Sequence, residues 1–219
     1  MSRHGLVVMA YGTPAAPDQV EAYYTHIRRG RPPTTEQLAD LARRYEAIGG
    51  LSPLATRTAD QVAAVAAALD AREPGRWAVA LGNKHAAPFV EDAVAHLAAG
   101  GVDRLVGLVL APHFSQGSVA QYHERAGSAA ASAGLPYAGI DAWHDEPAWL
   151  DAQVARVRAA LAGLPAATEV VFTAHSLPER IREWGDPYEG ELLDSSGLVA
   201  ERLALPDWRF AWQSAGGTG

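Results

Sequence analysis

The 219-residue sequence has no cysteine, so it can form no disulfide, no thiolate metal site and no iron–sulfur cluster. It also has no excess of positive charge, because 18 Lys and Arg against 25 Asp and Glu leave a formal net charge of −7. That balance disfavours nucleic acid or an anionic membrane surface as a partner. No apolar run is long enough for a transmembrane segment, and the N-terminus does not resemble a signal peptide. We therefore expect a cytoplasmic protein.

Several ligand-binding motifs are absent as well. Neither G-x-G-x-x-G nor a P-loop occurs, so no nucleotide cofactor is expected. No H-x-x-x-H, C-x-x-C or paired-carboxylate motif places two metal ligands together, so a structural role outweighs metal binding for His85 and His113. No internal repeat and no long low-complexity run is present. With 48% hydrophobic and 20% charged residues, the composition is that of an ordinary globular protein.

The sequence does contain a nearly unbroken alternation of apolar, β-rich runs with helical patterns. Strands are predicted at residues 5–12, 77–81, 105–112, 137–143, 170–174 and 208–214. Helices are predicted at residues 18–27, 35–48, 58–71, 90–99, 148–161 and 189–205, with a further helix around Tyr122. This alternation predicts an α/β fold with parallel sheets flanked by helices on both faces.

The run VVFTAHSLPERI, residues 170–181, begins with the predicted strand 170–174, and His175 follows this strand directly. Ser176 and Pro178 can cap and open a following helix, so His175 is predicted to lie at a strand-to-helix corner. The carboxyl ends of parallel strands face the ligand crevice in open α/β sheets. An imidazole in such a place can change its charge near neutral pH. His175 is therefore a candidate functional residue, with a structural turn histidine as the alternative.

Other predicted strand ends carry polar side chains, at Tyr11, at Lys84 and His85, and from His113 to Tyr122. Arginines gather in two clusters, which are Arg28, Arg29 and Arg31 in the first and Arg43 and Arg44 in the second. Guanidinium groups suit carboxylates, so two separate clusters indicate a ligand with more than one carboxylate. For any single arginine, a solvated helix end is the alternative.

The runs LVVMAYGTP, YYTHIRRGRPP, RYEAIGGLSPL, LAPHFSQGSVAQY, FTAHSLPERI, GDPY and WQSAGGT resemble the ferrochelatase family, and in particular its coproporphyrin-dependent branch of Gram-positive bacteria. The resemblance implies two Rossmann-like, chelatase-like lobes. It also implies insertion of Fe2+, as a substrate, into coproporphyrin III or protoporphyrin IX in haem biosynthesis. A porphyrin is then the expected ligand, and a transient contact with other haem-pathway enzymes is a further expectation.

The same resemblance assigns roles to individual residues. The histidine of the His-Ser-Leu-Pro motif falls on His175, where it would bind iron or accept a pyrrole proton. The tyrosine of the Tyr-Gly-Thr-Pro motif falls on Tyr11, which would ligate the inserted iron on the other face of the macrocycle. The positions that hold the propionates and the ring edge fall on Arg28, Arg44, Tyr45, Ser52 and Tyr122.

The family continues beyond its WQS-x-G-x-T-P motif, whereas this sequence ends at Gly219. We therefore expect an N-terminal chelatase lobe at residues 1–155 and a partial C-terminal lobe at 156–219. The glutamate that partners the family's histidine has no counterpart, which predicts impaired activity. Two alternatives stay open at this point, a non-catalytic porphyrin-binding protein and a small single-lobe chelatase of the cobalt or sirohydrochlorin kind.

Overall fold

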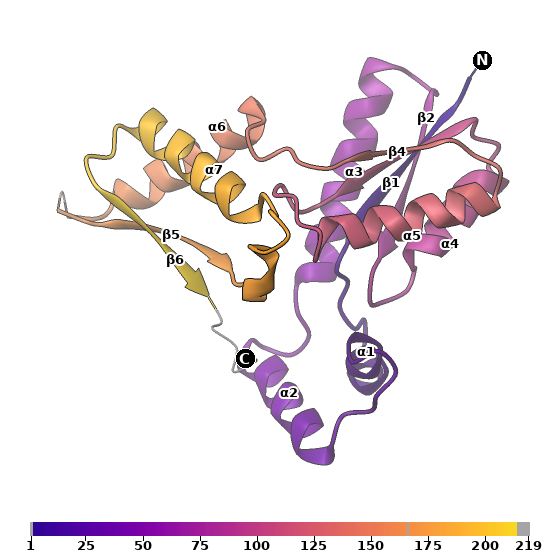
Figure 1. Cartoon of the computed structure of the whole chain (residues 1–219), viewed down its shortest axis with the longest axis horizontal. Coiled ribbons are helices and arrows are strands. Elements are labelled where there is room, and N and C mark those ends of the chain that lie inside the picture. Colours follow the sequence, from indigo (N-terminus) through magenta and orange to yellow (C-terminus); the bar gives the residue numbers. More distant parts are fainter. Residues whose placement is uncertain (1, 166, 214–219) are drawn as a thin grey trace. The chain divides into compact units, whose positions relative to one another are not determined.

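The structure is a computed structural model that describes residues 2–165 and 167–213 (Figure 1). The chain divides into two compact units. The first unit comprises Met1–Leu110 and Tyr122–Ile140, and the second comprises Ala111–Gln121 and Asp141–Gly219. Each unit is described by itself below. The lobe boundary between residues 155 and 156 stays a prediction from the sequence.

Within the described residues, the first unit contains one parallel sheet with the strand order β2-β1-β3-β4. Its strands are β1 (His4–Ala10), β2 (Trp77–Asn83), β3 (Arg104–Val109) and β4 (Tyr137–Ile140). Its helical elements are η1 (Pro17–Gln19), α1 (Val20–Ile27), α2 (Thr35–Ala47), α3 (Leu54–Arg72), α4 (Val90–Ala99) and α5 (Val119–Ser132), the last of which enters this unit at Tyr122. The α/β class expected from the sequence is confirmed.

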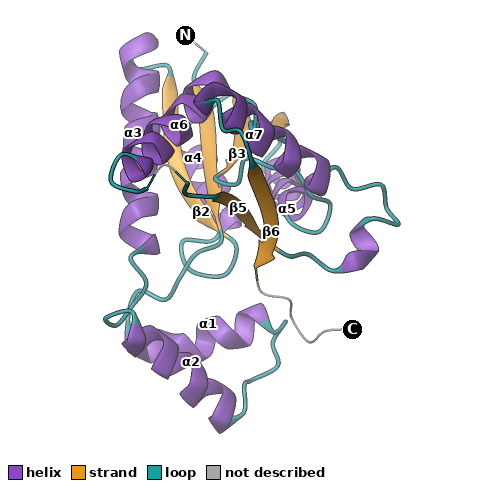
Figure 2. Ribbon diagram, turned by 90° about the vertical axis from the view of Figure 1, so that its left-hand side faces the viewer, coloured by secondary structure: helices purple, strands orange, loops and turns teal. Residues whose placement is uncertain are grey.

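The central strand β1 is buried on both faces, with Val7, Val8 and Met9 fully enclosed. A continuous apolar run, without alternation, is the pattern of a parallel strand covered on both sides. The chain passes from β1 to β2 on one side and then returns across β1 to β3. Because such crossovers are right-handed, the reversal places α3 on one face of the sheet and α4 and α5 on the other (Figures 1 and 2).

Local signals explain where these helices begin. Thr34 caps α2 through a capping box, in which its side chain accepts the Gln37 N–H at 3.2 Å and the Gln37 side chain accepts the Thr34 N–H at 3.0 Å. Asp92 of α4 likewise accepts the Phe89 N–H at 2.8 Å. Helix α3 begins at Leu54, four residues before the predicted start at Thr58, because the turn at Pro53 feeds directly into it. The prediction from the sequence therefore located these helices but made α3 too short at its N-terminus.

In the part of the chain that the structure describes, the second unit contains a parallel pair of strands, β5 (Val170–His175) and β6 (Trp208–Gln213). Helices α6 (Pro147–Leu161) and α7 (Tyr188–Leu203) lie along one face of this pair (Figure 1), and a short 3-10 helix η2 (Glu179–Ile181) follows β5. The core of this unit is Leu150, Val154 and Val199, packed against Phe172 of β5 and neighbouring side chains. Alternate residues of β5, including Val171 and His175, are exposed.

Two sequence-based expectations concern this unit, the helix predicted after His175 and the WQSAGGT run at the end of the chain. The predicted helix that Ser176 and Pro178 would open is wrong in form, because the chain after His175 makes a short loop and then only the three-residue η2. The residues of the WQSAGGT run from Ser214 onward lie outside the described residues. Among the described residues, no helix combines the length and the apolar character needed to cross a membrane.

Candidate functional site

Tyr11 lies directly after β1, at the carboxyl end of the strand where the sheet order reverses. That position is where open α/β sheets bind their ligands. The corner after β2 is attached to it, since the Lys84 N–H donates to the Ala10 carbonyl at 2.8 Å and the His85 N–H donates to the Tyr11 carbonyl at 3.0 Å. The Tyr11 and His85 rings are in contact, with centroids 4.5 Å apart at 49°. Burial raises the pKa of Tyr11.

His85 also contacts His26 from the last turn of α1, with their Nδ1 atoms 3.0 Å apart. Burial, followed by the positive charges of Lys84, His26 and Arg125 in that order, lowers the pKa of His85 to about 4. His85 is therefore neutral at pH 7. The sequence marked the Lys84 and His85 corner, but it gave no sign that a histidine 59 residues away would join it.

A cationic group lies beside this corner. The Lys84 ammonium is 4.9 Å from the centre of the Tyr122 ring, which is 4% exposed. Arg125 of α5 donates to the Lys84 carbonyl at 2.7 Å and pairs with Glu91 through two hydrogen bonds of 2.7 and 2.6 Å. Burial, followed by Arg125 and Arg29, lowers the pKa of Lys84. The positive charges of Lys84 and Arg125 thus lie close together at the end of β2, where they can attract an anionic ligand group.

Tyr23 of α1 lies among three of the predicted substrate-binding tyrosines. Its hydroxyl donates to the Gly12 carbonyl at 3.1 Å. Its pKa is raised mainly by burial and also by the electrostatic influence of three phenols, those of Tyr45, Tyr11 and Tyr122. These three predicted residues therefore lie within electrostatic reach of Tyr23. Tyr23 was not singled out from the sequence, because helical spacing does not reveal which partner a tyrosine hydroxyl will find.

The other predicted substrate-binding residues have local partners. Arg28 donates from Nε to the Arg31 carbonyl at 3.2 Å, and its guanidinium lies 5.5 Å from the Tyr24 ring centre. Arg44 is 76% exposed and pairs with Asp40 at 2.7 Å. The Ser52 hydroxyl accepts the Leu54 N–H at 3.2 Å. An exposed ion pair like that of Arg44 with Asp40 contributes only about 0–1 kcal/mol to stability, so Arg44 is available to a carboxylate ligand.

In the second unit, His175 is the last residue of β5 and is exposed. Its Nδ1 lies 2.7 Å from the Ser176 carbonyl oxygen, which can only accept a hydrogen bond. Nδ1 therefore donates this hydrogen bond, and Nε2 is the ring nitrogen left for another partner. The Tyr188 hydroxyl donates to the His175 carbonyl at 3.2 Å and steadies the strand end. This Nε2 can accept a proton or bind a metal ion.

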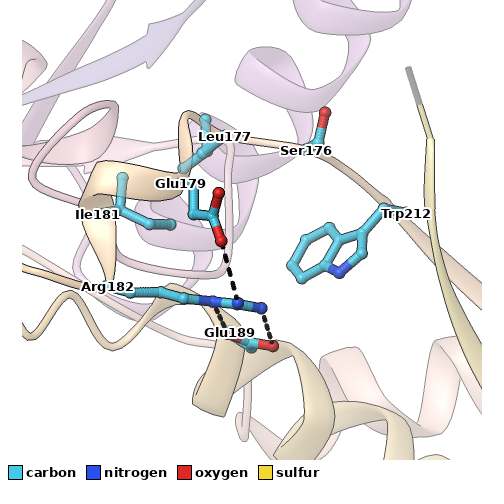
Figure 3. A pocket seen from close by; sticks show the side chains of 7 residues that line it. All are labelled: Ser176, Leu177, Glu179, Ile181, Arg182, Glu189 and Trp212. Atoms are coloured by element: carbon cyan, nitrogen blue, oxygen red, sulfur yellow. Dashed lines mark hydrogen bonds and ion pairs between the residues drawn. The ribbon is translucent and has the colours of Figure 1, made fainter. Parts of the chain in front are cut away.

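A pocket of about 180 Å³ is lined by residues of the segment that follows His175 and by Glu189 and Trp212 (Figure 3). It is lined by Ser176, Leu177, Glu179, Ile181, Arg182, Glu189 and Trp212. The Arg182 guanidinium donates to both Glu189 oxygens at 3.0 and 3.1 Å and lies 3.8 Å from Glu179. Trp212 stands across the pocket from these charges (Figure 3). This volume is below the roughly 300–1,000 Å³ of drug-sized ligand sites, so it admits a small ligand only.

The residues of the corner after β3 form hydrogen bonds to residues in and just before α7. His113 Nε2 is 2.8 Å from the Ser195 hydroxyl, and the pKa of His113 is lowered to about 4 by burial and then by His144. The Phe114 N–H donates to Glu191 at 2.6 Å. Ser115 donates to Asp186, the acidic residue of the GDPY run, at 2.9 Å. The sequence reasoning missed both carboxylates, Glu191 and Asp186, although the GDPY run includes Asp186.

Among residues 2–165 and 167–213, no group of three or more His, Cys, Asp and Glu side chains could hold a metal ion.

Comparison with known proteins decides the family. The Ferrochelatase family profile matches residues 3–219. The chain belongs to the ferrochelatase family. It is 44% identical to the coproporphyrin III ferrochelatases of Geobacillus sp. (strain WCH70) and Bacillus subtilis (strain 168), over 98% of this chain and 71% of each relative. It is 41% identical to a ferrochelatase of Herpetosiphon aurantiacus, over 100% of this chain and 73% of the relative. As a ferrochelatase family member, the chain is related to enzymes that insert a metal into a porphyrin.

Proposed function

We propose that this chain binds coproporphyrin III and inserts Fe2+ into it, the reaction named for its bacterial relatives. The observation that carries the proposal is 44% identity to those relatives along 98% of the chain. Two further observations support it, namely that Tyr11 and His175 each lie at the carboxyl end of a parallel strand. Iron and the porphyrin are then substrates, and the product belongs to haem biosynthesis.

Metal insertion replaces two pyrrole protons with Fe2+, so the reaction needs a proton acceptor near the pyrrole nitrogens. His175 suits this role because its Nδ1–H is given to the Ser176 carbonyl and Nε2 keeps a lone pair. A positioned imidazole accepts protons efficiently near neutral pH and typically contributes about 10²–10⁴-fold to a rate. The same lone pair can hold the incoming ion before transfer.

Tyr11 is the proposed ligand of the inserted iron. Burial raises its pKa, so its phenolate forms only with help from nearby positive charge or from the metal itself. The positive charge of the incoming iron supplies that help. Tyr11 then holds the metal through its oxygen while the protons leave the macrocycle.

Arg28 and Arg44 are the proposed partners of the propionate groups, and Tyr45, Ser52 and Tyr122 the proposed contacts of the ring edge. The four propionates of coproporphyrin III, against two on protoporphyrin IX, suit a surface with several arginines. The gathering of Tyr45, Tyr122 and Tyr11 around Tyr23 supports a shared binding surface in the first unit.

An anaerobic insertion assay tests the proposal through the loss of coproporphyrin III fluorescence on addition of Fe2+. We expect insertion by the wild-type chain and a rate lower by about 10² or more for His175→Ala. His96→Ala is the matched control, because His96 is an exposed histidine on α4 that is assigned no role. Tight porphyrin binding without insertion by the wild type would overturn the enzyme and leave a porphyrin-binding protein. Insertion of Co2+ into sirohydrochlorin, with none into coproporphyrin III, would favour the small single-lobe chelatase.

A further inference from the structure

His26, in the last turn of α1, has no role in the mechanism above. Its Nδ1 lies 3.0 Å from Nδ1 of His85, and the two rings meet edge to face with centroids 5.2 Å apart at 77°. The other side of the His26 ring stacks on Phe89, with centroids 5.2 Å apart at 25°. The exposed His26 ring therefore contacts two residues of the connection between β2 and α4, one on each side.

A hydrogen bond between two Nδ1 atoms needs a proton on one of them and a lone pair on the other. The two rings therefore cannot choose their tautomers independently. If His85 accepts this bond, its Nδ1 carries no proton, so the ring is neutral and its proton is on Nε2. If His85 donates, a neutral ring presents the lone pair at Nε2 instead.

The surrounding charges favour His26 as the donor. Lys84 and Arg125 act electrostatically on His85, and positive charge disfavours an additional proton there. The Glu91 carboxylate acts on His26, and negative charge favours a proton on that ring. His85 is then the acceptor at Nδ1 and carries an N–H at Nε2.

We propose that His26 is a positioning residue for the Tyr11 side of the site: it donates its Nδ1–H to His85 and thereby holds an Nε2–H donor beside Tyr11. The His85 ring is in direct contact with the Tyr11 ring, at 4.5 Å between centroids. A donor fixed in advance next to a phenolate stabilises the oxygen that binds iron, without reorganisation during the reaction. This inference rests on the proposed role of Tyr11 as iron ligand.

The first test reads the tautomer of His85 by two-bond 1H–15N correlation NMR of the labelled full chain at one pH, 7.5. We expect the proton on Nε2 and a hydrogen-bonded Nδ1 in the wild type. His26→Phe keeps the stacking on Phe89 but removes the donor, so His85 should become a mixture of tautomers. His26→Asn supplies an amide N–H near the place of Nδ1–H and should restore the wild-type signal. A wild-type His85 protonated on Nδ1, or an unchanged signal in His26→Phe, overturns the inference.

The second test separates this inference from the proposed function. Ferric coproporphyrin III is titrated into the three proteins at the same pH, and the tyrosinate-to-iron absorption band is recorded, with circular dichroism to verify folding. We expect His26→Phe to bind about 5–10-fold more weakly with a weaker band, and His26→Asn to behave as wild type. Equal affinity and equal bands in all three proteins overturn the role of His26 and leave Tyr11 as ligand. Binding without any tyrosinate band in the wild type overturns the role proposed for Tyr11, and that of the pair with it.

Discussion

The Ser115 hydroxyl donates a 2.9 Å hydrogen bond to a carboxylate oxygen of Asp186, 71 residues further along the chain. The Gln116 N–H donates to the same oxygen at 2.7 Å, and the Tyr188 N–H donates to the other oxygen at 3.0 Å. One side chain therefore ties the corner after β3 to the beginning of α7. Ser115 is fully buried, so the loss of Asp186 leaves its buried hydroxyl without an acceptor for its proton.

Replacement of this carboxylate should destabilise the second unit. We expect Asp186→Ala to lower the free energy of unfolding by about 2–4 kcal/mol, since charge-assisted hydrogen bonds contribute about 1.5–3 kcal/mol each and are not additive. Asp145→Ala removes an exposed aspartate and should change stability little. Urea denaturation followed by circular dichroism measures both. Equal stability of the two variants would contradict the structural role of Asp186.

A glycine in β3 is required by the side chain of its neighbour on β4. A Cβ at Gly107 would lie 2.0 Å from the Tyr137 hydroxyl oxygen and 2.9 Å from Cε of Met9. We expect Gly107→Ala to cost about 1–3 kcal/mol of stability, as overpacking of a filled core does. In Gly190→Ala nothing lies within 4 Å of the new Cβ inside α7, so helix propensity should raise stability by about 0.5–1 kcal/mol. Thermal unfolding that ranks the two variants in the reverse order would contradict the packing of Tyr137.

The stability of the chain should fall as the pH drops below about 6.5. The pKa of His113 is lowered to about 4 by burial and by His144, so in this range the unfolded chain binds a proton that the folded chain does not. Because stability rises with pH wherever the unfolded state binds more protons, this contribution is complete above pH 6.5 and is lost toward pH 4. His113→Gln keeps a donor for Ser195 without a titrating group. Urea denaturation between pH 5 and 6.5 should show a shallower slope for this variant, and an identical slope would contradict the burial of a neutral His113.

Arg44 and Arg43 form a matched pair for the proposed propionate contact. Both are exposed and both pair with Asp40, at 2.7 and 2.8 Å, but only Arg44 is a proposed partner of the propionate groups. We expect Arg44→Ala to weaken coproporphyrin III binding about tenfold, in line with the loss of one charge-assisted contact. Arg43→Ala should bind as wild type, and neither change should affect folding. Fluorescence titration measures the affinity for coproporphyrin III. An equal loss of affinity in both variants would show that general surface charge, and not a specific contact of Arg44, causes the effect.

The elements of the fold could be predicted because each strand is a compact apolar run between turn residues. Val7, Val8 and Met9, for example, form a continuous run and occupy the buried centre of the sheet. The polar residues Tyr11 and His85 could be placed at strand ends for the same reason, and their rings do meet. Patterns within a window of about ten residues carry this information.

Partners that are distant in the chain could not be predicted. His26 meets His85 across 59 residues, and Asp186 meets Ser115 across 71, and no local pattern encodes either pair. The loop after His175 was also misjudged, because Ser176 and Pro178 are common both at helix starts and in turns. Such contacts depend on how the elements pack, which a single sequence does not specify.

The most direct test of the proposed metal insertion is chemical rescue of His175→Ala in the anaerobic Fe2+ and coproporphyrin III assay. His175 is exposed at the end of β5, so free imidazole can reach its place. If the Nε2 lone pair of His175 accepts the pyrrole proton, the variant should be slower by about 10²-fold or more, and added imidazole should restore part of the rate. Insertion by His175→Ala at the wild-type rate, with no response to imidazole, would contradict the account.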